Sequence, residues 1–150
     1  MLDALFITPA VEAVTEALTS ANARGKLAVI GHAKLASALA DARKKAGDEV
    51  VPIGMSERAA KRLTNALADL SSVDNRSLAA VVGMDLAVDD GWEITLREWV
   101  RVTRDGGVLV FVDRGHAAEA SRRALCAGLT ELEQRHVGRT IVTSGLVTHL

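Results

Sequence analysis

Residues 96–115, LREWVRVTRDGGVLVFVDRG, constrain the fold of this chain more than any other stretch. The first half has the apolar spacing of an amphipathic helix that ends at Arg104. The second half is the uninterrupted apolar run 108–112, which is typical of a buried strand. Asp105, Gly106 and Gly107 join the two halves, and these residue types favour a turn. A helix that passes at once into a fully apolar strand is the unit of an α/β sheet.

The same alternation runs through the rest of the chain. The first helix is expected to begin with Thr8 as N-cap and Pro9 in its first turn, and to fade near Gly25. Further helices are expected at 33–46, 56–70, 91–103 and 116–127, and strands at 26–30, 49–53, 78–84, 108–113, 129–136 and 139–147.

This order predicts an α/β, Rossmann-like fold. We expect a mostly parallel sheet with a C-terminal antiparallel hairpin, right-handed crossovers and helices on both faces. Pro52 cannot donate a hydrogen bond to a neighbouring strand, so the second strand is expected at the edge of the sheet. The 150 residues are enough for a single domain, with residues 1–25 packed on it as a helical segment.

Composition excludes several function classes. A formal net charge of −1 offers no attraction for nucleic acid or anionic lipid, and the scarcity of aromatic residues disfavours a base-stacking surface. No apolar run approaches the ~20 residues that cross a bilayer, and the N-terminus lacks the basic flank of a signal peptide. Cys126 is the only cysteine, and its helical surroundings predict a small core residue. We therefore expect a cytoplasmic protein that binds neither nucleic acid nor membrane.

Residues 96–115 resemble the helix-to-strand region of class I S-adenosylmethionine (SAM) dependent methyltransferases, in which an LRE…RVL(K/R)PGG.L pattern is common. Residues 77–85, SLAAVVGMD, are similar to the family strand (S)FDAVV, and residues 127–140 are similar to the closing AGF.…E…GRT. The resemblance covers nearly the whole chain from Lys26 onward. It implies the Rossmann-like methyltransferase fold, truncated around the third strand, and SAM as the cofactor of an active member.

The positions that match the family's cofactor site depart from its pattern. The glycine-rich turn after the first strand, often G-x-G-x-G, is reduced to Gly31 followed by His32, and the loop is shorter by about two residues. Gly54 stands where the second strand usually ends in an acid that binds both ribose hydroxyls. Asp69 matches the acid that contacts adenine, although its spacing equally fits a solvated helix residue, and Asp85 ends the strand 78–84. The resemblance implies these five residues as the cofactor-binding positions of a degenerate member.

Other polar residues have two interpretations each. His32 either contributes to a site or simply starts a helix, and Asp85 and Asp113 either face a ligand from one rim or cap turns. Arg114 and His116 lie beside Asp113 in the sequence. The histidines lack the spacing of metal ligands, no G-x-S-x-G nucleophile is present, and both tryptophans are expected in the core. We expect no catalytic residue and no metal.

These observations fit two functions of different classes, an interaction module and an enzyme. The first is a methyltransferase-like pseudoenzyme that has lost SAM and acts as a protein-interaction or scaffolding module. The alternative is a small active SAM-dependent methyltransferase of unknown acceptor, because the cofactor carries the reactivity and the protein mainly aligns the reactants. A nicotinamide-binding domain is disfavoured by the lack of G-x-G-x-x-G and its acid. An exposed second strand or an uncovered sheet face further predicts a homodimer or a protein partner.

Overall fold

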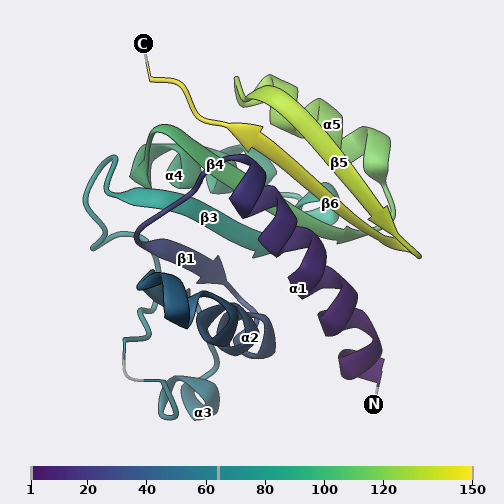
Figure 1. The fold of residues 1–150 in the computed structure, drawn as a ribbon. Coiled ribbons are helices and arrows are strands. Elements are labelled where there is room, and N and C mark those ends of the chain that lie inside the picture. The colour runs from purple at the N-terminus through teal and green to yellow at the C-terminus, as the bar shows by residue number, and fades with distance from the viewer. Residues whose placement is uncertain (1, 64, 150) are drawn as a thin grey trace.

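The alternating elements build one six-stranded mixed sheet in the order β2-β1-β3-β4-β6-β5. Figure 1 shows β1, β3, β4, β6 and β5 following one another across this sheet. The computed structural model describes residues 2–63 and 65–149. The first four strands are parallel, and β6 pairs antiparallel with β4 and with β5. The strands are β1 (Leu27–Ile30), β2 (Val50–Ile53), β3 (Leu78–Met84), β4 (Thr103–Arg114), β5 (Thr130–Val137) and β6 (Thr140–Leu146). The sequence-based fold class, including the C-terminal hairpin, is confirmed.

Helices cover both faces of this sheet (Figure 1). They are α1 (Leu2–Ser20), α2 (Ala33–Arg43), α3 (Glu57–Ala60), α4 (Trp92–Val102) and α5 (Ala117–Cys126), with 3-10 turns η1 (Lys44–Ala46) and η2 (Leu86–Val88). Successive strand residues point to opposite faces. Val29 and Val110 therefore pack with α1 and α2, whereas Ala28 and Phe111 pack with α4 and α5. Two apolar cores result, one on each side of the sheet.

The first helix starts earlier than predicted. Instead of beginning at Thr8, α1 extends from Leu2 and contains Pro9 in its interior. Proline removes one backbone donor from a helix, and here the helix accommodates that loss without ending. Further along α1, Val14 and Leu18 are fully buried against the sheet.

The helix predicted over 56–70 is wrong for most of its length. Ser56 caps a single turn, α3, residues 61–63 and 65–66 have no regular structure, and Leu67 forms a parallel bridge with Ile53. The N–H of Leu67 donates to the carbonyl oxygen of Pro52 (2.9 Å). β2 is the outermost strand of the sheet, as Pro52 predicted, but this bridge partly covers its outer edge.

The turn before the long apolar strand is a bulge within β4. Thr103 already pairs with Leu78, and pairing resumes only at Val108 opposite Ala80. The strand therefore begins before the Asp-Gly-Gly turn that the sequence suggested as its boundary. The extra residues leave the pairing of β3 and β4 in register from Val108 onward.

Two residues expected in the core are less buried than predicted. Cys126 is exposed at the last turn of α5, because only Ala120 and Ala124 of that helix face the sheet. Trp92, at the first turn of α4, is half-buried, whereas Trp99 is buried as predicted. No helix in the described part of the chain has the length and apolarity needed to span a membrane.

A buried ion pair joins the end of α2 to the loops that precede β1 and β2. Arg43, at the end of α2, donates to the Asp48 carboxylate (2.7 Å) and to the carbonyl oxygen of Ala23. Asp48 also accepts a hydrogen bond from the N–H of Gly25 (2.9 Å). Burial alone would raise the pKa of Asp48, but the Gly25 hydrogen bond and the Arg43 charge outweigh it and lower the pKa.

Candidate functional site

A pocket of about 430 Å³ lies at the carboxyl ends of β1 and β2. Ligands of open α/β sheets bind at this edge, where the strand order reverses. Ile30, Ile53 and Gly54 line it from the strands, Asp69 from the loop that precedes β3, and Trp99 from α4. Of the five residues implied as cofactor-binding positions, Gly54 and Asp69 line this pocket.

The floor of the pocket depends on a glycine in a buried strand. A Cβ atom on Gly83 would lie 2.1 Å from the indole of Trp99, so only glycine lets the ring rest on β3. Trp99 also contacts Phe111, the residue of β4 that pairs with Gly83, with 5.9 Å between ring centroids and planes tilted by 56°. Trp99 thus rests on two adjacent strands and provides an apolar surface beneath the pocket.

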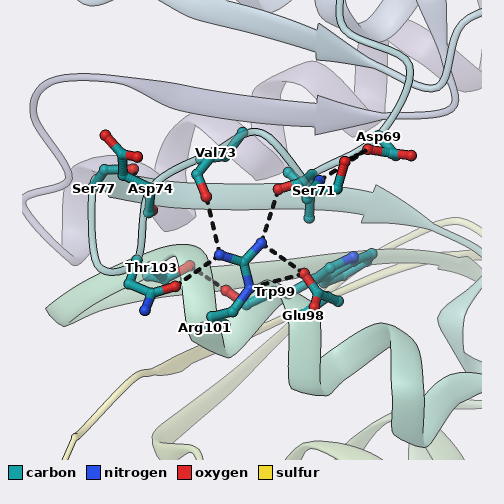
Figure 2. Close-up of polar contacts among 11 residues, drawn as sticks. Asp69, Ser71, Val73, Asp74, Ser77, Glu98, Trp99, Arg101 and Thr103 are labelled. Carbon is teal, nitrogen blue, oxygen red and sulfur yellow. Dashed lines mark hydrogen bonds and ion pairs between the residues drawn. The ribbon is translucent and has the colours of Figure 1, made fainter.

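The outer wall of the pocket is a loop that Arg101 ties to α4. The guanidinium of Arg101 donates to the carbonyl oxygens of Leu70 (2.8 Å) and Val73 (3.0 Å) and to the side chain of Asn75 (2.8 Å). Glu98, one turn earlier on the helix, orients the guanidinium by accepting two hydrogen bonds. Figure 2 shows this side chain pointing from the helix into the loop. A segment without regular structure thereby acquires a defined position.

Asp69 lines the pocket, but its carboxylate is partly used. Its Oδ1 accepts hydrogen bonds from the backbone N–H and the hydroxyl of Ser71, which together form a tight turn (Figure 2). The side-chain hydrogen bond from Ser71, followed by the backbone one, lowers the pKa of Asp69. The carboxylate is therefore ionised at neutral pH, with Oδ2 left for another donor.

The turn between β1 and α2 is closed by its own hydrogen bonds. Gly31 has φ +75° and donates its N–H to the carbonyl oxygen of Ile53 (2.8 Å). His32 is the N-cap of α2, and its Nδ1 accepts from the N–H of Leu35 (3.2 Å). Of the two interpretations of His32, the helix-starting role is the one observed, and the turn contains only these two residues.

Gly54 follows β2 in a left-handed conformation, with φ +68°. Its N–H donates to the carbonyl oxygen of Leu67 (2.9 Å), which is part of the bridge at the sheet edge. Residues other than glycine, asparagine and aspartate rarely adopt this conformation. The position that matches the family's ribose-binding acid thus has no side chain, and Asp69 is the carboxylate that lines the same pocket.

Asp85 and Asp113 lie away from this pocket. Asp85 is exposed at φ +58°, and its N–H extends the pairing of β3 with β4 by donating to the carbonyl oxygen of Val112 (2.9 Å). Asp113 is buried, with Oδ1 accepting from the N–H of Ala87 (2.9 Å) and Oδ2 without a hydrogen-bond partner in the described part of the chain. Burial raises its pKa, and the nearby charge of Asp85 adds to this effect. Asp113 therefore supports the turn at Ala87 through its Oδ1.

The structure thus brings together Gly54 and Asp69 at one pocket, with Gly31 and His32 in the adjoining turn, and leaves Asp85 outside it. Sequence reasoning missed Arg101 and the pairing of Trp99 with Gly83. A glycine inside a buried strand was the available signal for the second. Within residues 2–63 and 65–149, no group of three or more His, Cys, Asp or Glu side chains is arranged to hold a metal ion.

This chain is similar to known proteins in its structure, whereas its sequence gives no match. The sequence matches no protein-family model and no curated protein. A chain in the complex of the Haloferax volcanii Trm112 methyltransferase activator with a putative methyltransferase has a TM-score of 0.71 and 16% identity, over 91% of this chain and 89% of that one. A SAM-dependent methyltransferase from Aquifex aeolicus has a TM-score of 0.70 and 14% identity, over 92% and 89%.

A third similar structure belongs to a longer chain. The DszA carbon methyltransferase has a TM-score of 0.75 and 10% identity, over 97% of this chain but 54% of its own. The chain therefore spans about half the length of some methyltransferases it resembles and nearly all of others. Because the sheet order, the hairpin and the neighbours agree, this chain has the fold of the class I SAM-dependent methyltransferases, in a small and truncated form.

Proposed function

We propose that this chain is a methyltransferase-fold domain that does not use SAM and acts through contact with another protein or with a second copy of itself. The observation that carries the proposal is the left-handed Gly54 at the end of β2, where the fold's ribose-binding acid would stand. The proposal concerns cofactor binding. Methyl transfer needs few catalytic side chains, because SAM itself is reactive, but it depends on the contacts that hold SAM.

The loss of that acid has a calculable cost. Hydrogen bonds to a charged acceptor contribute about 1.5–3 kcal/mol each. Losing the two made to the ribose hydroxyls lowers affinity by about two to four powers of ten. Asp69 lines the same pocket, but one of its oxygens is already engaged by Ser71. The residues present therefore fit the ribose poorly.

The turn after β1 weakens the fit at the other end of the cofactor. A glycine-rich turn offers free backbone N–H groups and close approach of the backbone to the ligand. Here the N–H of Gly31 already donates to the carbonyl oxygen of Ile53, and α2 begins at Ala33 directly after its N-cap, His32. The short turn supports the interpretation that the methionine end of SAM lacks its usual contacts.

A partner protein is consistent with one of the structural neighbours. A chain of similar fold comes from the complex of the Haloferax volcanii Trm112 methyltransferase activator with a putative methyltransferase. This chain exposes large apolar side chains that a partner would cover, among them Ile94 (70% exposed) and Leu125 (62% exposed). Neither observation identifies the partner, but both favour a function exerted through contact.

Thermal unfolding with and without cofactor tests the proposal. A ligand that binds only the folded state raises the midpoint temperature, by an amount that grows with its concentration over its Kd. We expect no shift with SAM or S-adenosylhomocysteine, whereas the Aquifex aeolicus methyltransferase serves as the positive control. A concentration-dependent shift for this chain would contradict the proposal.

One observation favours the alternative, an active methyltransferase. The pocket at the carboxyl ends of β1 and β2 retains about 430 Å³ and presents an ionised Asp69 beside the apolar floor of Trp99. If SAM binds there, Asp69→Asn should weaken it and Asp85→Asn should not. Equal effects of the two substitutions would remove the support for this alternative.

A further inference from the structure

A second hollow, of about 220 Å³, lies between the C-terminal end of α1 and the sheet. α1 packs across β4, β5 and β6 in this region (Figure 1). The last turn of α1 contributes Ala17 and Ser20 to the lining, and the rest comes from the two residues after the helix, from β4, and from the β5–β6 hairpin. The hollow shares no residue with the pocket at the carboxyl ends of β1 and β2. We refer to it as the α1–hairpin hollow.

One polar side chain that lines this hollow is buried without a partner. Ser144 of β6 lies opposite Val110 and Glu133 on the neighbouring strands, so its side chain is on the face of the sheet that α1 covers. Ser144 is 6% exposed, and its hydroxyl makes no hydrogen bond within the described part of the chain. Because buried polar groups normally have a hydrogen-bond partner, this hydroxyl indicates that an occupant of the hollow supplies one.

The charges around the hollow favour a cation as that occupant. Glu131 and Glu133 line it, and none of the described residues that line it is basic. Arg135 pairs with Glu133 (3.0 Å) and also with Glu16 on α1 (3.5 Å), so two carboxylates share its single charge. Glu131 is exposed and makes no ion pair within residues 2–63 and 65–149. Three carboxylates therefore stand against one guanidinium here.

The C-terminal end of α1 adds to this preference. The last carbonyl groups of a helix carry a partial negative charge, which basic residues in the last turn usually offset. The last turn of α1, residues 17–20, contains no basic residue. The next basic residue, Arg24, pairs with Asp48 (3.6 Å) and donates to the carbonyl oxygen of Ala46 (3.1 Å). The end of this helix therefore lacks a cation of its own.

We propose that the α1–hairpin hollow binds the ammonium group of a small aliphatic amine. An ammonium group offers three donors and no acceptor, so it can donate both to the Ser144 hydroxyl and to the Glu131 carboxylate. The hollow has several times the volume of ~30 Å³ that one water molecule occupies in the liquid, and Ala17, Ala21 and Val108 give a short carbon chain an apolar wall. An anion would be repelled by the glutamates.

Titration of the intact ¹⁵N-labelled chain with three matched compounds tests the proposal. Butylammonium carries the positive charge, butanol replaces it with a neutral hydroxyl, and butyrate reverses it. We expect butylammonium to give saturable shifts in the backbone signals of Asn22, Glu131 and Ser144, with an affinity that falls as salt rises, and the other two compounds to give none there. Equal binding of butanol would contradict the proposal. No saturable shift with butylammonium would leave the hollow to water and overturn it.

Two substitutions test where the ammonium group binds. Ser144→Ala should weaken butylammonium by about tenfold, because it removes the buried acceptor, and Glu131→Gln should weaken it by several-fold. Glu93→Gln, at an exposed position of α4 outside the hollow, is the matched control with the same change of charge and should leave the affinity unchanged. Equal losses from Glu131→Gln and Glu93→Gln would show a response to net charge alone and contradict the site.

The same ammonium group ends a lysine side chain, so Nα-acetyl-lysine methylamide is the fourth compound. Weaker binding of this capped lysine than of butylammonium supports a free amine as the ligand, and tighter binding contradicts it. The inference does not depend on the proposed function. A thermal shift with SAM would contradict the proposed loss of the cofactor and leave the amine result unchanged, whereas a failed amine titration would overturn the hollow alone.

Discussion

At the scale of single residues, Gly83 allows Trp99 to form the apolar floor of the pocket. Its missing Cβ is what allows the indole of Trp99 to lie on β3, since an added carbon would come within 2.1 Å of the ring. We predict that Gly83→Ala lowers the free energy of unfolding by about 2 kcal/mol, the usual cost of overpacking a core. Urea unfolding measures this change. Gly91→Ala is the control, because the nearest atom to an added Cβ there lies 3.7 Å away.

Two buried carboxylates should give opposite pH dependence. The pKa of Asp48 is lowered, so its contribution to stability is present above its unfolded pKa of about 3.9 and is lost as the pH falls through its folded pKa. The advantage of the wild-type chain over Asp48→Asn should therefore be largest near neutral pH and shrink in acid. Free energies of unfolding measured across this pH range check the sign.

Asp113 should behave in the reverse way. Its pKa is raised, so its stabilising contribution is complete below the unfolded pKa of about 3.9 and is lost as the pH rises through the folded pKa. Asp113→Asn, which keeps an acceptor for the N–H of Ala87, should gain stability relative to wild type as the pH rises toward 7. A constant difference between the two proteins at every pH would contradict the assignment.

At the scale of elements, Arg101 determines whether the loop before β3 forms a wall. Arg101→Ala removes three hydrogen bonds to that loop and should cost about 2 kcal/mol of unfolding free energy. Amide hydrogen exchange should rise more in residues 70–76 than in β4, whose exchange should change only by the loss of global stability. Arg97→Ala, one turn earlier and exposed, is the matched control. Uniform exchange throughout the chain after Arg101→Ala would argue against a local role.

Most elements were predictable because their periodicity and their flanking residues agree. β3 was placed at its observed bounds, and α4 and α5 within one residue at each end, since apolar runs and turn residues marked them. The helix predicted over 56–70 was wrong because Leu67 and Leu70 have helical spacing for a different reason. One bridges to the sheet edge beside Ile53, and the other is buried among residues that pack with α4. Periodicity alone cannot separate these cases.

The candidate site was predictable in part. The preference of open α/β sheets for ligands at the carboxyl ends of their strands directed attention to this edge of the sheet. The departures from the family pattern directed attention to Gly31 and Gly54, because glycines after strands mark turns. Asp85 and Asp69 had the same sequence signal, and only the tertiary structure puts Asp69 in the pocket and Asp85 outside it. Arg101 could not be found, because its partners are backbone carbonyls about 30 residues away, whose positions no pattern records.

At the scale of the whole molecule, the edge of β2 still predicts association. The bridge from Leu67 covers part of that edge, and Leu67 itself remains 37% exposed. We expect a second copy or a partner to cover it, although Pro52 disfavours direct strand pairing. Light scattering over a range of concentrations checks this prediction. A strict monomer at high concentration with no copurifying protein would count against it.

Calorimetric titration of the chain with SAM tests the central claim most directly, that the methyltransferase fold is retained without its cofactor. The account predicts no measurable heat of binding at micromolar cofactor, for SAM and for S-adenosylhomocysteine. Gly54→Asp should not restore binding, because the closed turn at Gly31 and His32 remains. Micromolar affinity of the unmodified chain for SAM would contradict the claim and make an active methyltransferase the better interpretation.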